Sequence, residues 1–524
     1  MFSLLSDLGF GQSPVTLHLS TLSTYSISIL FSLLILTVLN VISGSWLPSV
    51  KKTIRSLCRG SSKLHSDRPQ LAPISPVTPF EKKSQARNQE TFQSPEDLVE
   101  LSVWHRIDSE LETFESTHHR FWWNTHSGKA LAILLHAAEY PEHLQHRDLK
   151  FFATSVAPYL GVSRETTKGN ALQWPSFMTD DGTPLELSWD WGTKDGPPTI
   201  RYSIEPIGLQ AGSSVDPGNL IAGPAFQEEL DRSLVDMRLE WFQHFRKFFD
   251  VRNDETGFIQ DAIDHNTSIF YAFDLSPTEV TAKVYFFPKM RAQAKGQSNL
   301  EVLSQAIRAA PYATKDNLQA WDMFCDFSSD LSSRAIEYEM LAIDLINPFE
   351  SRLKIYFRSR ETTFDSVLNI MTVGGRITNP KLYQGLEDLR LLWNALFDTD
   401  VNTDSQKSLP AVGHRTAGIL YNVEFRLGEP YPVAKIYLPV RHYASSDAAI
   451  IRGLNLYFQH HQRGRYMPNY VKAMRKLFSQ KSMEATSGVH TYIGCAIRPN
   501  GTLRVVSYFK PGIPEFLLSQ RGNH

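Results

Sequence analysis

Five runs of alternating polar and apolar residues recur along the chain, roughly 70–80 residues apart, and each carries a basic residue near a tyrosine. They are Thr199–Gly208, Thr281–Pro288, Arg352–Arg358, Val433–Pro439 and Thr502–Pro511. Alternation with a period of two is the pattern of a β-strand with two different faces. Lys283 shares its face with Tyr285, whereas Val284 points to the other side. The pattern predicts five strands, each with an apolar face and a cationic, tyrosine-rich face.

Amphipathic helices are predicted between these runs, because apolar residues there recur at spacings of three and four. A first helix is expected from Pro95, followed by Lys129–Ala138, Phe226–Asp250, Asn299–Ala309, Asn317–Leu331, Leu386–Phe397, Ala448–His461 and Tyr470–Phe478. The turn between Leu185–Trp191 and Thr199–Ile204 indicates a hairpin, and hairpin strands are antiparallel. Helices and hairpins therefore alternate about five times.

An α+β fold follows, in which about ten antiparallel strands close into a barrel with helices outside. Closure leaves no unpaired strand edge. Helices with an apolar stripe need an apolar surface to cover, which turns the cationic face toward the lumen. Taken singly, each run also fits a solvated outer face, where lysine and tyrosine are common. The repetition and the intervening helices favour the lumen.

Composition excludes some classes of function. A net charge of −2 and a pI near 6.8 lack the basic surface that nucleic-acid binding needs, so no nucleic-acid partner is expected. Three widely spaced cysteines provide neither a disulfide framework nor a paired metal motif, which suits a reducing compartment.

The N-terminal part differs from the rest. Residues 25–47 contain no charged side chain, and 23 such residues can span a bilayer as a helix. A signal peptide and a buried helix are the alternatives, but no basic residue precedes the run. Basic residues follow it at Lys51, Lys52, Arg55, Arg59 and Lys63. By the positive-inside tendency, a single-pass anchor with a cytosolic C-terminal domain is expected. The predicted divisions are 1–24, an anchor at 25–47, a linker at 48–94, the barrel at 95–515 and a tail at 516–524.

Several segments resemble the fungal dimethylallyltryptophan synthase-type aromatic prenyltransferases. They are WPSFMTDDGTPLELSWDW from Trp174, IRYSIEPIG, KVYFFP, RLKIYFR, AKIYLPVRHY and TYIGCAIRPNG with TLRVVSYFKP. The resemblance covers about residues 95–515. It implies a ten-stranded prenyltransferase (ABBA) barrel that transfers an allylic group from its diphosphate to an electron-rich ring, in secondary metabolism and without a metal cofactor.

The resemblance also implies roles for individual residues. Glu186 corresponds to the glutamate that accepts the acceptor's N–H. The prenyl diphosphate is expected to contact Arg201, Lys283, Tyr285, Arg352, Lys354, Tyr356, Lys435, Tyr437 and Tyr508. A shield around the allylic cation is expected from Tyr285, Tyr356, Tyr437, Tyr492 and Tyr508. The family's proton-accepting lysine is missing, because the corresponding strand reads SIFYAFDLS from Ser268. This departure leaves the base for the ring proton open.

The residues themselves support diphosphate chemistry without a metal. Leaving diphosphate carries about three negative charges, which basic side chains can stabilise. No DDxxD motif is present, and the acidic run at Asp398, Asp400 and Asp404 fits a solvated turn. The expected partners are dimethylallyl or geranyl diphosphate and an indole-type acceptor that is alkylated at carbon. A phenolic or polyketide acceptor is an alternative. A non-catalytic barrel that binds prenyl diphosphates is another.

Overall fold

The computed structural model describes residues 101–111, 113–163, 172–251, 265–330, 336–399 and 404–512. The segments predicted at 1–24, 25–47, 48–94 and 516–524 lie outside these ranges. Within the described ranges, no helix is both long and apolar enough to cross a bilayer.

Ten antiparallel strands form one closed barrel in which each strand pairs with its sequence neighbours and β1 pairs with β10. They are β1 (Leu185–Gly192), β2 (Thr199–Ile204), β3 (Ile269–Leu275), β4 (Val280–Phe286), β5 (Ile336–Asp344), β6 (Leu353–Ser359), β7 (Ile419–Phe425), β8 (Val433–Leu438), β9 (His490–Ile497) and β10 (Leu503–Phe509). The five cationic runs are the even-numbered strands. The predicted ten-stranded antiparallel barrel is confirmed.

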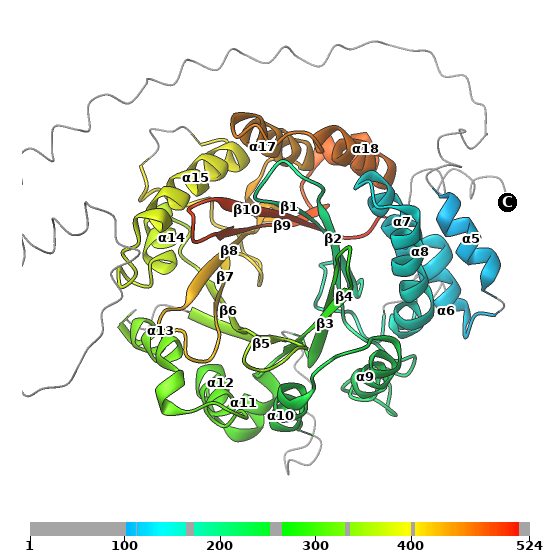
Figure 1. The fold of residues 1–524 in the computed structure, drawn as a ribbon, viewed down its shortest axis with the longest axis horizontal. Helices are drawn as coiled ribbons and strands as arrows, with labels where there is room; N and C mark the ends of the chain where they lie inside the picture. Colours follow the sequence, from blue (N-terminus) through cyan, green and yellow to red (C-terminus); the bar gives the residue numbers. More distant parts are fainter. Residues whose placement is uncertain are drawn as a thin grey trace, which may run out of the picture. The chain divides into compact units, whose positions relative to one another are not determined.

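Helices surround the strands, as Figure 1 shows in a view down the barrel. Before β1 come α5 (Ser102–Glu110), α6 (Thr117–Arg120), α7 (Ser127–Ala137) and α8 (Glu142–Phe151), with short π and 3-10 turns at Phe121–Thr125, Phe152–Val156 and Ala157–Tyr159. Between hairpins come α9 (Ala222–Ser233), α10 (Glu240–Phe249), α11 (Lys289–Lys295), α12 (Asn299–Arg308), α13 (Gln319–Asp330), α14 (Phe364–Met371), α15 (Pro380–Phe397), α16 (Val440–Tyr443), α17 (Asp447–His460), α18 (Met467–Leu477) and α19 (Gln480–Ala485). The alternation of helices and hairpins is as predicted.

Two helix predictions were wrong in their bounds. The single helix expected over Phe226–Asp250 is two helices, α9 and α10, separated by a turn in which Asp236 has a positive φ of 64°. Helix α15 begins at Pro380, before the predicted Leu386, because the Asn379 side chain caps it and proline fits the first helical turn.

The outer face of the barrel is apolar and carries the helices. On α10, the rings of Phe242, Phe245 and Phe249 lie 5.9, 6.0 and 5.8 Å from Phe286 of β4. Burying these side chains supplies much of the driving force that attaches a helix to the barrel. Since adjacent strand residues point to opposite faces, the polar positions of the same strands line the lumen.

The tryptophans of β1 also pack outward, as the strand pattern predicts. Trp189 lies 5.3 Å from the ring of Tyr470 on α18, and Trp191 lies 4.6 Å from Phe458 on α17. Both are buried. They therefore belong to the packing between strand and helices and leave the opposite face of β1 to Glu186 and Ser188.

Helices α15 and α17 approach each other closely at Gly453. A Cβ atom added there would lie 2.4 Å from the carbonyl oxygen of Ala395, which is backbone and cannot rotate away. The contact therefore requires glycine in the middle of α17, although glycine lowers helix propensity by about 1 kcal/mol.

We predict that Gly453→Ala lowers the free energy of unfolding by about 1–3 kcal/mol, because the overpacking cost exceeds the gain in helix propensity. Chemical denaturation of the purified protein measures this. Gly464→Ala is the matched control, since its Cβ would meet only Gln459 Cγ, at 4.0 Å. Equal stability of the two variants would contradict the close approach.

Candidate active site

One end of the lumen carries acidic and basic side chains on alternating strands. Odd-numbered strands supply Asp190, Asp274, Asp344 and Glu424, and even-numbered strands supply Arg201, Lys283, Lys354, Lys435 and Arg504, with Arg352 just before β6. We call these ten residues the charged ring. The exception is β9, which places Ala496 between Lys435 and Arg504.

Each carboxylate of the charged ring bridges two basic groups. Asp344 lies 2.5 Å from Lys354 Nζ and 3.0 Å from Arg352 Nε. Glu424 lies 3.2 Å from Arg352 Nη1 and 2.5 Å from Lys435 Nζ. Asp190 pairs with Arg201 and Arg504, and Asp274 pairs with Lys283 and Arg201. Pairing of this kind is what allows so many charges to sit inside a barrel.

Neighbouring basic groups lower the pKa of Asp274, Asp344 and Glu424 and keep these carboxylates ionised. Burial alone would raise the pKa of Glu424, but Lys435 and Arg352 bring it down to about 2. Asp274 behaves in the same way beside Lys283 and Arg201, with a pKa of about 2. Burial lowers the pKa of Lys354, and Asp344 opposes this shift. Basic groups outnumber acidic groups in the charged ring by six to four, so it keeps capacity for an added anion.

A layer of tyrosines lies next to the charged ring. Tyr285, Tyr356, Tyr437 and Tyr508 form a chain with ring centroids 5.6, 5.8 and 5.9 Å apart. The Tyr356 and Tyr437 hydroxyls lie 3.3 Å apart. Burial raises the phenol pKa of all four, so the hydroxyls stay neutral. The layer therefore presents aromatic faces and neutral O–H donors to the lumen.

Glycine 494 of β9 makes room for this layer. A Cβ atom at Gly494 would lie 2.9 Å from the Tyr508 ring and 3.2 Å from the Tyr437 ring. Asn422 of β7 donates a hydrogen bond of 3.1 Å to the Tyr437 hydroxyl. Small and polar neighbours thus fix the tyrosine rings against the wall of the barrel.

Glu186 lies beyond the tyrosines in a cavity of the lumen. It accepts a hydrogen bond of 2.6 Å from Thr491 Oγ1. Burial raises the pKa of Glu186 to about 7, although the Thr491 hydrogen bond and the charge of Arg441 oppose the shift. The cavity is lined by Phe177, Met178, Glu186, Ser203, Phe270, Tyr285, Glu339, Met340, Tyr356, Arg358, Thr416, Leu420, Tyr437, Arg441, Tyr492 and Tyr508. A carboxylate that titrates near neutral pH therefore faces an aromatic cavity.

Two further ion pairs border the Glu186 cavity. Arg358 Nε donates to Glu339 Oε1 at 2.7 Å. Arg441 Nη1 lies 3.1 Å from Asp180 Oδ2, and its guanidinium stands 5.2 Å from the Tyr492 ring. Both arginine side chains are at least nine-tenths buried. They fix the polar edge of this cavity.

The structure brings all the predicted site residues to one lumen. Glu186 and the tyrosines Tyr285, Tyr356, Tyr437, Tyr492 and Tyr508 line its cavity. The predicted basic residues belong to the charged ring. The first run adds no tyrosine to the lumen, because Tyr202 is adjacent to Arg201 and points outward, 5.5 Å from the ring of Phe152. The strand period places Ser203 inside instead.

Sequence reasoning missed the four carboxylates of the charged ring, together with Glu339, Arg358 and Arg441. A signal was available for the carboxylates. Each is a single acid between apolar residues near the end of the first strand of a hairpin, as in AFDL and AIDL. Antiparallel pairing then places Asp274 opposite Thr281 and Asp344 opposite Lys283.

Acidic residues elsewhere do not form a metal site in the part of the chain described. Asp180 pairs with Arg441, and Asp181 accepts hydrogen bonds from Thr179 and Thr183. Asp398 ends α15, and Asp400 lies outside the described residues. Across the described ranges, no group of three or more potential metal ligands occurs.

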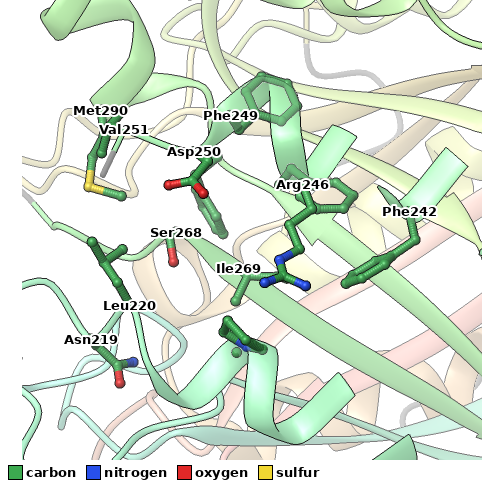
Figure 2. Close-up of a pocket in the computed structure, with 14 residues that line it drawn as sticks. Asn219, Leu220, Phe242, Arg246, Phe249, Asp250, Val251, Ser268, Ile269 and Met290 are labelled. Carbon is green, nitrogen blue, oxygen red and sulfur yellow. The ribbon is translucent and has the colours of Figure 1, made fainter. Parts of the chain in front are cut away.

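A separate hollow lies outside the barrel, between α9, α10 and the outer face of β3 and β4. Figure 2 shows Arg246 and Phe242 of α10 beside Ile269 of β3 in this hollow. It contains none of the predicted site residues. The candidate active site is therefore the lumen.

We predict that Asp190→Asn destabilises the fold by about 3–5 kcal/mol, because Arg201 and Arg504 lose the carboxylate they share. Inorganic pyrophosphate should then raise the melting temperature more in this variant than in the wild type, since the anion replaces the missing charge. Differential scanning fluorimetry with and without pyrophosphate measures both effects. An equal pyrophosphate shift in the two proteins would contradict the role of Asp190 as a counter-ion.

Solved structures share this fold. AnaPT from Neosartorya fischeri aligns with a TM-score of 0.67 and 22% identity, covering 79% of this chain and 98% of that protein. The 5-dimethylallyltryptophan synthase from Streptomyces coelicolor aligns with a TM-score of 0.52 and 19% identity, covering 73% of this chain and 96% of that protein.

The solved structures show the fold alone, whereas sequence comparison identifies the family. A 4-O-dimethylallyl-L-tyrosine synthase from Claviceps purpurea is 36% identical over 78% of this chain and 91% of its own length. A 7-dimethylallyltryptophan synthase from Aspergillus fumigatus is 33% identical over 74% of this chain and 84% of its own length. Residues 118–473 match the family model described as tryptophan dimethylallyltransferase. With its barrel, charged ring and tyrosine layer, this chain belongs to the dimethylallyltryptophan synthase-type family of aromatic prenyltransferases.

Proposed function

We propose that this prenyltransferase joins a dimethylallyl group, taken from its diphosphate, to an aromatic acceptor whose O–H or N–H is held by Glu186. A longer prenyl group is the alternative donor. The observation that carries the proposal is the order of layers in one lumen: charged ring, tyrosines, then a carboxylate with a raised pKa.

The charged ring suits the diphosphate of the donor. When the C–O bond of the donor breaks, negative charge develops on the leaving diphosphate. Preorganised basic groups stabilise such charge without reorganising at that moment. Arg201, Lys283, Arg352, Lys354 and Lys435 are the groups proposed to hold it. They supply the charge that a divalent metal ion provides in other prenyl-diphosphate enzymes, so we propose that the reaction needs no metal.

The tyrosine layer suits the allylic cation. Aromatic faces attract a cation through the ring quadrupole, at about 0.5–2 kcal/mol for each favourable contact. The rings of Tyr285, Tyr356, Tyr437 and Tyr508 also occupy space that water would fill, which protects the cation from hydrolysis. Tyr492 completes the proposed shield on the side of Glu186.

The fate of the acceptor's proton favours attack by oxygen. Glu186 can take the proton of a phenol while the phenol oxygen forms the new bond, so one base is enough. Attack by a ring carbon needs a second base for the ring proton. Among the described residues that line the cavity there is no lysine or histidine, and Glu339 is paired with Arg358. Phe270 faces the cavity from β3, within the stretch that lacks the family's lysine. We therefore propose a phenolic hydroxyl as the acceptor group.

An indole acceptor alkylated at carbon, as the sequence analysis predicted, is the second candidate. The 33% identity to a 7-dimethylallyltryptophan synthase favours it, whereas the 36% identity to a 4-O-dimethylallyl-L-tyrosine synthase favours the phenol. In the indole case Glu186 holds the N–H, and the ring proton must pass to the departing diphosphate. Either acceptor fits an enzyme of secondary metabolism.

The test is a reaction of the protein with dimethylallyl diphosphate, EDTA and a panel of phenols, indoles and cyclic dipeptides, read by mass spectrometry. We expect a product one prenyl unit heavier from a phenol, and cleavage of its aryl ether by mild acid. A product only from indoles, stable to acid, would replace the first candidate with the second.

For Glu186→Gln we predict a loss of kcat/KM of about 10²–10⁴-fold, with unchanged binding of the diphosphate donor. The ionised form is the base, so wild-type kcat/KM should fall as pH drops below about 7, the pKa of Glu186. The variant should lose this inflection. Glu142→Gln, at an exposed site on α8, is the control and should keep both rate and inflection. A Glu186→Gln profile identical to that of the wild type would exclude Glu186 as the base.

We also propose that residues 25–47 anchor the chain in a membrane with the barrel in the cytosol. The support is the 23-residue uncharged run and the basic residues that follow it. Deletion of residues 1–93 should move the protein from the membrane fraction to the soluble fraction and leave its activity intact. Full-length protein in the soluble fraction would contradict the anchor.

A further inference from the structure

A second cavity lies over the rim of the barrel at the end that holds the charged ring. Its volume is about 600 Å³, which leaves room for a hydrated diphosphate. It is lined by Arg352, Met371, Arg376, Ile377, Thr378, Asn379, Leu382, Glu424, Phe425, Arg426, Glu429, Tyr431, Pro432, Val433, Ala434, Lys435, Ala496, Ile497, Arg498 and Pro499. We call it the rim pocket.

The rim pocket is continuous with the charged ring. Arg352, Glu424 and Lys435 belong to the ring and also line the pocket. Outward residues of the same strands, such as Phe425 and Ile497, line its other side. The pocket therefore crosses from the lumen to the outside over the ends of β7, β8 and β9.

The rim pocket is positively charged. It contains five basic side chains and two acidic ones among its lining residues. Arg426 pairs with Glu429 at 3.1 Å, and Arg376 pairs with Asp330. Arg498 is exposed and, within the described ranges, no carboxylate lies within ion-pair distance of it. Burial lowers the pKa of Lys435, and the charge of Arg498 adds to that effect, so the two cations act on each other.

A helix start reinforces this charge. Thr378 and Asn379 line the pocket immediately before the 18-residue helix α15. The first turn of a helix carries a partial positive charge, and α15 keeps this charge although Asn379 accepts hydrogen bonds from its first N–H groups. The pocket thus combines an unpaired arginine with the positive end of a long helix.

The gap in the charged ring faces the rim pocket. Ala496 pairs with both Lys435 and Arg504, so these two cations flank β9, the one odd-numbered strand that supplies no acid to the charged ring. Ala496 itself lines the pocket. The excess positive charge of the ring is therefore open to the pocket on this side.

We propose that the rim pocket is the route by which the diphosphate of the donor reaches the charged ring and by which released pyrophosphate leaves. Arg498 steers the anion through electrostatic attraction and does not touch the reacting atoms. This inference rests on the proposed prenyl diphosphate donor. Steering of this kind raises association rates by about 10–10³-fold and weakens as ionic strength rises.

The test measures association of inorganic pyrophosphate with the full chain by stopped-flow fluorescence of its tryptophans, at several salt concentrations. In Arg498→Glu we expect association to slow about tenfold and to depend less on salt. The kcat/KM for the donor should fall by a similar factor, with the KM for the acceptor unchanged. Arg498→Gln should give an intermediate rate.

Arg452→Glu on α17 is the matched control, because Arg452 is exposed and the change in net charge is the same. Equal slowing in the Arg452 and Arg498 variants would overturn the route, as would an unchanged rate in Arg498→Glu with a native melting temperature. Pyrophosphate association needs no acceptor or turnover, so the result does not depend on finding the acceptor. Failure of the wild type to bind pyrophosphate would instead refute the proposed donor.

Discussion

The charged ring is the constraint on which the rest of this structure depends. Burying a basic side chain without a partner costs several kcal/mol, and six of them face one lumen. Antiparallel pairing solves this by placing an acid from four of the five odd-numbered strands, such as Asp274 on β3, between bases on the neighbouring strands. The barrel thereby holds concentrated positive charge inside a folded core.

The layers inside the barrel follow from the strand period. Because side chains two apart share a face, a strand that places Lys283 in the charged ring must place Tyr285 in the next layer. The same spacing occurs in β4, β6 and β8, whereas in β10 the tyrosine, Tyr508, lies four residues after Arg504 on the same face. Together these strands produce the tyrosine layer, and Gly494 leaves the space for it. Charge, aromatic surface and carboxylate are therefore separated along the lumen axis, which is the order that the proposed diphosphate, carbocation and acceptor sites require.

Sequence reasoning predicted the barrel correctly because the alternation of its strands is visible in the chain. The same alternation explains why the predicted basic residues and tyrosines meet in one lumen. Sequence reasoning missed the acids of the charged ring, because Asp190 and Glu424 form their ion pairs with residues that are far away in the sequence. It also missed Arg441, on α16 just after β8, and Arg358, two residues after Tyr356 on β6, because no repeated motif marks either position. Its single helix over Phe226–Asp250 failed because a local turn at Asp236 interrupts a continuous helical pattern.

The sequence by itself determined the five hairpins, the cationic runs and the family, because alternation and motif spacing are local properties of the chain. Tertiary structure alone decided which charges neutralise one another, that burial brings the pKa of Glu186 to about 7, and that Ala496 opens the ring toward the rim pocket. The physical reason is that pairing, desolvation and cavities arise between strands distant in the sequence. They exist only once the barrel has closed.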